Sequence, residues 1–406
     1  MDDNSNNISR LIAGLLDEYG EELCGDQRRI MALLADLLPG RRREASVLGQ
    51  AIRQGIPDAV RVHQPLLPAD IARLAARLYD NAGIAKEFGA WAVQTWAEAL
   101  GHSAGSAGAA PVPVEVQSKT EHRVLSDHSG AIADLQFSDD GKSLASASRD
   151  GAVRVWSVAT GWSLQCFDRH PGGAIAVAMS PDGDRLVSSA AQETALRRPG
   201  QNAPGLKGHK ARVGTLDFSP RGEWMASGDN NGVVRLWKQT GRRIFREIAA
   251  HDTAITALKF SPNGQRLVTA CEGGQAQVFD VASARSIAHF ELSGACLAAT
   301  IDQAGSRIIL GGADTTARMF DVESTRELLT IEAELPVAAL ALAPDGVRLA
   351  IGTWGPVIGL WDIQSGVSLA NFVGHSAAIG ALAMSPDGLH LASGSADHTI
   401  RIWPLL

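Results

Sequence analysis

The sequence has few cysteines and few aromatic residues. Phe, Trp and Tyr make up 5% of the 406 residues, and only two residues are Tyr. The four cysteines are scattered, without a C-x-x-C pair or a neighbouring His cluster: Cys24, Cys166, Cys271 and Cys296. This spacing argues against a disulfide framework or a structural zinc site, so we predict four buried, reduced thiols, no bound metal and no cofactor.

The sequence also lacks an excess of basic residues and any long apolar run. The 37 Lys and Arg residues are outnumbered by 44 Asp and Glu, which gives a net charge of -7. A broadly basic nucleic-acid-binding surface is therefore not expected. The apolar run 11–16 is far shorter than the roughly 18 residues of a membrane span, and it follows Asp2 and Asp3 instead of a basic leader. We expect no membrane association and a cytoplasmic location.

The sequence pattern divides the chain into three regions. Its 45% hydrophobic and 20% charged residues are typical of globular proteins, and its length predicts two or three domains. Residues 1–100 have helical periodicity, and everything after about residue 121 repeats. Between them, residues 101–120 (GHSAGSAGAAPVPVEVQSKT) are rich in Gly, Ala, Ser and Pro and predict a flexible linker.

Residues 1–100 predict about five amphipathic helices. They are expected at 8–19, 27–38 (after a capping Asp26), 44–54, 69–81 and 85–100. In the last of these, Phe88, Trp91, Thr95 and Trp96 lie on one wide apolar face; core packing is the ordinary interpretation and a partner groove is the alternative. The run 41–43 (RRR) in an acidic module favours a solvated helix entrance over a nucleic-acid site.

Residues 121–406 contain an internal repeat with a period of 39–42 residues. A turn glycine recurs seven times, at Gly141, Gly183, Gly222, Gly264, Gly305, Gly346 and Gly388. Fifteen residues later stands an aromatic residue in six of the seven repeats, and thirteen residues earlier stands a histidine in five. Short alternating segments between Gly, Asp, Pro and Asn turns indicate strands, and a period of this length is typical of propeller blades.

These repeats resemble the WD-repeat β-propeller family. The resemblance is carried by Gly374-His375, SPDG at 385–388 and SGSADHTIRIW at 393–403. It implies an all-β seven-bladed β-propeller over residues 121–406, preceded by a small all-α domain. The last repeat has three strands, and the segment 122–126 (HRVLS) is expected to complete it and close the ring.

Repeat two departs most from the pattern. Arg198 and Pro199 replace the aromatic residue and its successor, and QNAPG follows. Because proline cannot donate to a sheet ladder, we expect a short or bulged strand there.

The recurring His, Asp, Ser and Trp residues invite a comparison with a hydrolase triad. In the family they instead form hydrogen-bond sets inside each blade, and an enzyme needs one site where a scaffold needs the same bond in every blade. The full sets are expected only in repeats one and seven: His128, Asp150, Trp156, with Ser146 or Ser148, and His375, Asp397, Trp403, with Ser393 or Ser395. The other repeats carry Gln192, Asn231, Gly273, Asp314 and Gly355 at the Asp position.

The resemblance also implies a partner-binding face at one end of the blades. Family members present there the residue before the Asp position and the third residue after the His position, most of which are small in this chain. The exceptions are the candidate partner-binding residues: Trp354, Arg149, Arg212, Asn230 and Glu272. Trp and Arg dominate interface energetics, and the two arginines suit an acidic or phosphorylated peptide. Local packing of Trp354 and simple solvation of the arginines are the alternatives.

The sequence therefore favours a non-enzymatic scaffold or adaptor that binds a protein or peptide partner on the propeller, while the helical module recruits a second component. That module resembles small all-helical modules that bacterial multidomain proteins carry beside kinases, ATPases or repeat arrays; the likeness rests on DQRRIMALLADLLPGRRREASVL and WAVQTWAEAL. The alternative is a propeller enzyme or ligand-binding protein that uses the central channel. It needs acidic or His residues on the innermost strands, which are expected to be small and apolar (GALAM, AALAL).

Overall fold

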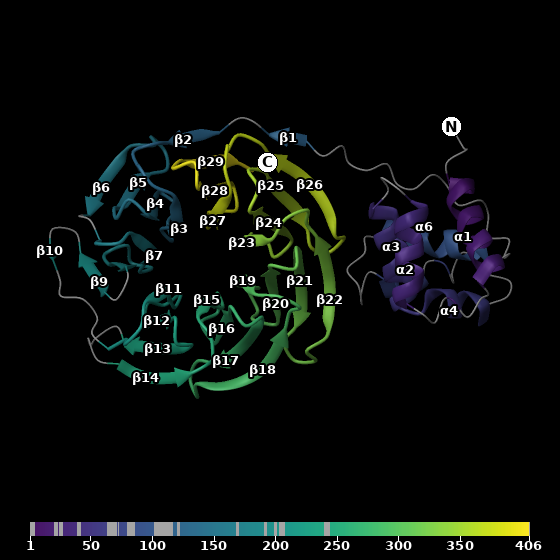
Figure 1. Cartoon of the computed structure of the whole chain (residues 1–406), viewed down its shortest axis with the longest axis horizontal. Coiled ribbons are helices and arrows are strands. Elements are labelled where there is room, and N and C mark those ends of the chain that lie inside the picture. The colour runs from purple at the N-terminus through teal and green to yellow at the C-terminus, as the bar shows by residue number, and fades with distance from the viewer. Residues whose placement is uncertain are drawn as a thin grey trace. The chain divides into compact units, whose positions relative to one another are not determined.

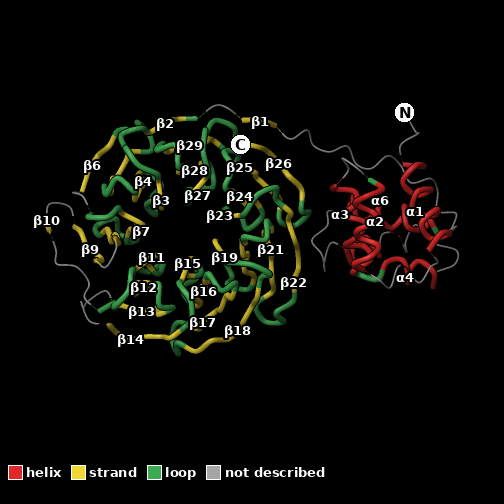
Figure 2. The backbone as a smooth tube through the Cα atoms, viewed as in Figure 1, coloured by secondary structure: helices red, strands yellow, loops and turns green. Residues whose placement is uncertain are grey.

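The computed structural model describes residues 5–19, 23, 27–38, 42–62, 71, 73–78, 86–100, 117–119, 122–167, 170–190, 193–198, 201–202, 208–238 and 244–405. The chain divides into two compact units. One comprises Met1–Val116 with the turn Asp362–Val367, and the other comprises Gln117–Trp361 and Ser368–Leu406. The labelled helices belong to the first unit and the strands to the second (Figures 1 and 2).

The first unit is helical, as predicted. Its labelled helices are α1 (Ser5–Tyr19), α2 (Gln27–Leu37), α3 (Arg42–Arg53), α4 (Ile56–Val62) and α6 (Lys86–Ala99), and residues 71 and 73–78 are helical too. Helix α4 was not predicted, because Gly55 and Pro57 resemble a chain break; proline is nevertheless tolerated in the first turn of a helix. The predicted cap Asp26 and the side chains of the run 41–43 lie outside the described residues.

Helix α6 lies at the centre of the helical unit and contacts α1, α3 and α4. Trp91, Thr95 and Trp96 on its apolar face are at most 4% exposed, and Trp96 Nε1 donates to the carbonyl oxygen of Leu48 in α3 at 3.3 Å. This face packs in the core, so the partner-groove interpretation of its described residues is wrong. The side chain of Phe88 lies outside the described residues.

The second unit is a β-propeller. Its four-stranded sheets, from the innermost strand outward, are β3 (Ile132–Phe137), β4 (Ser143–Ser148), β5 (Val153–Ser157), β6 (Ser163–Phe167); β7 (Ala174–Met179), β8 (Leu186–Ala190), β9 (Glu193–Arg198), β10 (Gln201–Asn202); β11 (Val213–Phe218), β12 (Trp224–Asp229), β13 (Val233–Lys238), β14 (Ile244–Ala249); β15 (Ile255–Phe260), β16 (Arg266–Cys271), β17 (Gln275–Asp280), β18 (Arg285–Glu291); β19 (Cys296–Ile301), β20 (Arg307–Gly312), β21 (Thr316–Asp321), β22 (Glu327–Glu332); and β27 (Ile379–Met384), β28 (His390–Ser395), β29 (Ile400–Pro404), β2 (Arg123–Leu125).

One further sheet has five strands: β23 (Val337–Leu342), β24 (Arg348–Thr353), β25 (Ile358–Asp362), β26 (Val367–Phe372) and β1 (Gln117–Lys119). The prediction of seven four-stranded blades is therefore wrong. The described strands form six four-stranded blades, and the remaining sheet gains a strand because β1 pairs in parallel with β26, Gln117 opposite Ala370. Since β1 falls within the predicted linker, that part of the linker prediction is wrong as well; residues 101–116 lie outside the described residues.

The innermost strands form a closed ring (Figure 1). Strands β3, β7, β11, β15, β19, β23 and β27 contact one another in this order, and β27 contacts β3. The predicted closure by 122–126 is confirmed, because β2 pairs antiparallel with β29, Leu125 opposite Ile400. Strands from the two ends of the repeat region therefore complete one sheet. Because β2 pairs with β29, the backbone groups along the outer edge of β29 are not left unpaired.

The sheet of repeat two is more regular than predicted. Strand β9 keeps six residues and ends at Arg198, and Gln201–Asn202 form the short outer strand β10. Side chains of 191–202 lie outside the described residues.

A tight turn explains the recurring glycine. Gly141 has φ 69° and its N–H donates to the carbonyl of Ser138 at 2.8 Å; the other six turn glycines have φ between 66° and 74°. This left-handed conformation carries little cost only for glycine, which is why the repeat stands out in the sequence. The turn joins the two innermost strands of each sheet and sets their register.

Candidate functional site

In three of the sheets a histidine, an aspartate, a serine and a tryptophan form a hydrogen-bonded set that joins a loop to the strands. In the sheet of β3–β6, His128 Nδ1 lies 2.9 Å from Asp150 Oδ2, and His128 Nε2 lies 2.8 Å from Ser146 Oγ, which also accepts from Trp156 Nε1 at 2.8 Å. The sheet that contains β27–β29 has the same set, made by His375, Asp397, Ser393 and Trp403, with distances of 2.8, 2.7 and 2.8 Å. The second serine of each strand, Ser148 or Ser395, instead donates to a backbone carbonyl.

The third set was missed by the sequence analysis. His209 Nδ1 lies 2.7 Å from Asp229 Oδ2, and Ser227 Oγ joins His209 Nε2 and Trp237 Nε1 at 2.6 and 2.8 Å. Asp229 stands two residues before Asn231, the residue at the expected Asp position. The prediction that only repeats one and seven hold a complete set is therefore wrong; a search for Asp at either position would have found this one.

Burial and hydrogen bonding together shift the pKa values of these groups. Burial lowers the pKa of His128, His209 and His375, against the opposing effect of the bonded carboxylates. Burial alone would raise the pKa of Asp397, but hydrogen bonds from Thr399, the Ser376 N–H and His375 hold it well below its usual range. A neutral imidazole with its proton on Nδ1 then donates to the carboxylate and accepts from the serine hydroxyl.

The serines in these sets have no access to a substrate. Ser146, Ser227 and Ser393 are 0% exposed, and each already accepts the indole N–H of a buried tryptophan. A nucleophile must reach the reacting carbon of its substrate, so these three serines are placed for internal bonding and not for attack.

Two other sheets hold reduced versions of the set. His170 Nε2 lies 2.7 Å from Ser188 Oγ, and His251 Nε2 lies 2.8 Å from Thr269 Oγ1. His251 Nδ1 is buried without a hydrogen-bond partner among the described residues. Burial and, to a lesser extent, the charge of His289 lower the pKa of His251 to about 4. The imidazole is therefore neutral at pH 7.

A recurring backbone bond defines one end of the sheets, called here the loop face. In each case the residue before the Asp position donates its N–H to the carbonyl of the third residue after the His position, as Trp354 does to Pro336 at 3.1 Å. The same bond joins Arg149 to Ala131, Asn230 to Arg212, Glu272 to Ala254, Ala313 to Ala295 and Ala396 to Ala378. Each pair thus brings two candidate surface positions together at the same end of its sheet.

The predicted partner-binding residues all belong to this loop face. Arg149, Asn230, Glu272 and Trp354 are exposed, while Arg212 is half-buried. Neither arginine forms an ion pair with a residue that the structure describes. Their role in binding stays a prediction.

The β22–β23 and β24–β25 loops expose three large apolar side chains, and we call Leu335, Trp354 and Val357 the apolar patch. Trp354 is 57%, Leu335 43% and Val357 39% exposed. Leu335 lies directly over Gly355, since a Cβ added at Gly355 would come within 2.9 Å of Leu335 Cδ1. Sequence reasoning missed Leu335 and Val357, because neither occupies a position that the resemblance marks.

Small side chains in the two adjoining sheets leave Trp354 of the apolar patch uncovered. The adjoining sheets on either side carry alanine at the positions equivalent to Trp354 and Pro336: Ala295, Ala313, Ala378 and Ala396. An indole flanked by methyl groups on both sides stays accessible to a partner.

The central channel is more polar than predicted. The small apolar strands β23 and β27 are as expected, but β3, β11, β15 and β19 carry Asp134, Gln136, Asp217, Lys259 and Thr300. Gln136, Asp217, Lys259 and Thr300 line a pocket of about 330 Å³, together with Asp139 and apolar residues of neighbouring sheets.

Three of these side chains bridge neighbouring innermost strands. Asp134 accepts the N–H of Val177 at 2.9 Å, Gln136 that of Met179 at 2.6 Å, and Asp217 that of Phe260 at 2.8 Å. Burial raises the pKa of Asp134 to about 6 and also raises that of Asp217, although the ammonium of Lys259, 3.4 Å from Asp217, opposes both shifts. These bonds compensate for the unpaired edges that innermost strands present to one another.

The remaining residue-level predictions have mixed outcomes. Cys271 and Cys296 are buried, but Cys166 is exposed on β6, so the prediction of four buried thiols is wrong there; Cys24 lies outside the described residues. Within the ranges that the structure describes, no group of His, Cys, Asp and Glu is arranged to hold a metal ion, and no helix is long and apolar enough to cross a membrane.

Comparison with known families decides the nature of the repeats. The family described as WD domain, G-beta repeat matches residues 119–157 and 366–404, which include the two hydrogen-bonded sets of His128 and His375. These two segments of the β-propeller are thus similar to WD repeats. A second family, the anaphase-promoting complex subunit 4 WD40 domain, matches residues 216–302 of the same propeller.

Several curated proteins are similar to part of the chain. The chain is 31% identical to apoptotic protease-activating factor 1 of Rattus norvegicus over 189 residues, which is 43% of this chain and 15% of that protein. It is 26% identical to transcription initiation factor TFIID subunit 5 of Caenorhabditis elegans over 196 residues, 48% of this chain and 29% of that protein. It is also 29% identical to the uncharacterized WD repeat-containing protein sll1491 of Synechocystis over 153 residues, 37% of this chain and 44% of that protein.

The chain thus spans less than half the length of each of these relatives. One of these relatives is by name a subunit of a transcription initiation factor.

Proposed function

We propose that this protein is a non-enzymatic scaffold, whose WD-repeat propeller binds a protein or peptide partner on the loop face through the apolar patch of Leu335, Trp354 and Val357. The observation that carries this proposal is the 57% exposure of Trp354 between sheets that present only alanine at the equivalent positions. A large apolar side chain held in water costs free energy until a partner covers it.

The arginines of the loop face extend the proposed contact. Arg149 and Arg212 belong to other sheets of the same ring, and each lacks a carboxylate partner among the described residues. A partner with an apolar anchor for Trp354 and an acidic or phosphorylated segment would use both features, since an arginine binds a carboxylate or phosphate in bidentate fashion.

Substitution of Trp354 by Ala tests the proposal. Because Trp354 is exposed, the W354A variant should keep its free energy of unfolding within about 0.5 kcal/mol of wild type while it captures much less partner in an affinity pull-down. Trp162, which is 75% exposed but lies in the β5–β6 turn, provides the matched control W162A, which should capture partner normally. A loss of several kcal/mol in W354A, or capture equal to that of wild type, would contradict the proposal.

The helical unit is proposed to recruit a second component in the cytoplasm. Its support is a separate hydrophobic core, to which α1, α2, α3, α4 and α6 contribute, in a unit whose first segment is Met1–Val116. Mass spectrometry of proteins captured by full-length chain, by residues 1–116 and by residues 117–406 tests this assignment. The boundary between the two fragments follows residue 116 because β1, which begins at Gln117, is a strand of the propeller. Capture of every partner by 117–406 alone would contradict a recruiting role for the helices.

A further inference from the structure

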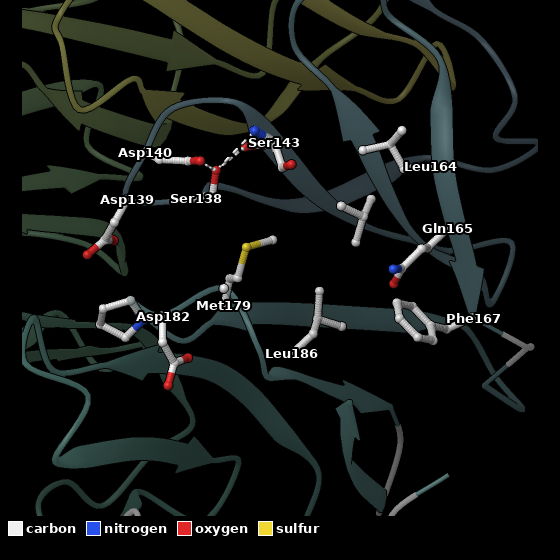
Figure 3. A pocket seen from close by; sticks show the side chains of 13 residues that line it. Ser138, Asp139, Asp140, Ser143, Leu164, Gln165, Phe167, Met179, Asp182 and Leu186 are labelled. Carbon is white, nitrogen blue, oxygen red and sulfur yellow. Dashed lines mark hydrogen bonds between the residues drawn. The ribbon is translucent and has the colours of Figure 1, made fainter. Parts of the chain in front are cut away.

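A second groove opens between the sheets of β3–β6 and β7–β10 (Figure 3). It has a volume of about 290 Å³. The β3–β4 and β7–β8 turns form one end of it, β5, β6 and the start of β8 form the other, and the end of β7 lies between them. Since those turns lie at the opposite ends of the strands from the loops of Arg149 and Trp354, this groove is separate from the loop face.

One end of the groove is acidic. Asp139, Asp140 and Asp182 line it, and no Lys or Arg is among the lining residues. Asp140 and Asp182 each use one carboxylate oxygen inside their own turns, on the hydroxyl groups of Ser138 and Ser180.

Two of these carboxylates form ion pairs with basic side chains that do not line the groove. Lys142 Nζ lies 3.7 Å from Asp140 in an exposed pair, and Arg185 lies 3.2 Å from Asp182. Asp139 has no hydrogen bond or ion pair with any described residue. Burial and then the charges of Asp140, Asp182 and Asp217 raise the pKa of Asp139. A carboxylate surrounded by carboxylates in this way is stabilised by an incoming cation.

The other end of the groove is apolar and partly open to water. Leu164 is 57% exposed and Phe167 is half-buried, both on β6. Figure 3 shows the side chains of Leu164, Phe167 and Leu186 at one end, the carboxylates of Asp139 and Asp182 at the other, and Met179 between them. Methionine adapts its shape to varied apolar groups, which suits the floor of a peptide groove.

We propose that this groove binds a peptide segment that carries one basic and one apolar side chain, with the basic group beside Asp139 and the apolar group against Leu164 and Phe167. Charge complementarity selects this occupant, because an acidic segment would be repelled at the turns and a purely apolar one would leave Asp139 without a counter-ion. The proposal is independent of the loop face, so the protein would bind two segments at opposite ends of its sheets.

Fluorescence polarisation with the full-length protein tests the proposal. The probes are labelled decapeptides of Gly and Ser that carry one Arg and one Leu two, three or four residues apart, and matched peptides in which Glu replaces Arg. We expect at least one Arg/Leu peptide to saturate at a Kd well below about 1 mM, and its Glu/Leu partner to bind at least tenfold more weakly. Affinity of the Arg/Leu peptide should fall as salt is raised.

Variants assign the contact to the groove. D139N removes the charge of a side chain that has no hydrogen bond or ion pair with any described residue, so it should leave thermal unfolding unchanged. It should raise the Kd of the Arg/Leu peptide about tenfold. L164S removes the apolar contact at the other end and should have the same two effects. The controls are D252N, which changes an exposed acid in the β14–β15 loop, and W354A on the loop face; both should bind the peptide as wild type does. Equal binding of Arg and Glu peptides, an unchanged Kd in D139N, or loss of binding in W354A would overturn the proposal. Because W354A belongs to the loop face, failure of one site is distinguishable from failure of the other.

Discussion

His209 and Asp229 are joined by a 2.7 Å contact between Nδ1 and Oδ2, and both side chains are only 3% exposed. Asp229 also accepts the backbone N–H groups of Asn231 and Val233 through its other oxygen. One carboxylate therefore holds the imidazole and the whole β12–β13 turn. The residue that performs this role stands two positions before the one that the repeat pattern marks.

Replacement of Asp229 should lower the free energy of unfolding. D229A leaves the imidazole of His209 and two turn N–H groups without their acceptor, and we expect a loss of about 3 kcal/mol in the free energy of unfolding. The control is N231A, at the position that the repeat pattern marks: Asn231 is exposed, and we expect a change within about 0.5 kcal/mol. Urea unfolding followed by tryptophan fluorescence measures both. Similar losses in the two variants would mean that Asp229 is not the anchor.

Acid should destabilise the protein through His251. Its pKa is lowered to about 4 in the folded state, so between pH 6.5 and pH 4 the unfolded chain binds a proton that the folded chain does not. Stability is then fully present above pH 6.5 and decreases as the pH falls, by up to about 3 kcal/mol from this residue. In unfolding titrations between pH 7.5 and pH 5, H251Q should lose less stability than wild type. H398N changes an exposed histidine at a positive φ that Asn tolerates, and it should follow the wild-type curve.

The closing strand β2 should be required for a stable ring. Leu125 is 2% exposed and packs with Ile400 and Ile402 in one core cluster, whereas its neighbour Val124 is 45% exposed. We expect L125A to lower the free energy of unfolding by about 2–4 kcal/mol and V124A to change it by less than about 0.5 kcal/mol. Thermal unfolding of the two variants measures the difference. An L125A variant as stable as wild type would show that β2 contributes nothing to closure.

Lys259 should stabilise the channel mainly when Asp217 is ionised. K259M leaves this buried carboxylate without its ammonium, which costs about 1–2 kcal/mol at pH 7, less than for a fully buried pair because the Lys259 side chain is 46% exposed. The loss should shrink as the pH falls and Asp217 takes up a proton, since burial already raises its pKa. The double variant K259M/D217N should recover much of the stability. K142M, at a side chain that is 83% exposed, is the control, and a pH-independent loss in K259M would contradict this account.

The sequence predicted the repeat, its turns and most of the internal hydrogen bonds. A glycine at positive φ, a histidine and an indole each meet a local requirement of a few neighbouring residues, so they recur at fixed spacing in the chain. The small offset of Asp229, the helix that begins around Pro57 and the two-residue strand β10 escaped this reasoning, because each departs from the period or resembles a chain break.

The sequence by itself determined the period of the propeller repeat and the positions of its recurring glycine turns, since turn geometry restricts residue type locally. Only the tertiary structure decided that Gln117–Lys119 join β26 and that Asp134, Gln136 and Asp217 bridge the innermost strands. It also decided that Leu335 lies over Gly355 and that Asp139 has no counter-ion among the described residues. These relationships join residues that are far apart in the chain or depend on which side chains water reaches, and both are set by how the sheets pack and not by local residue preference.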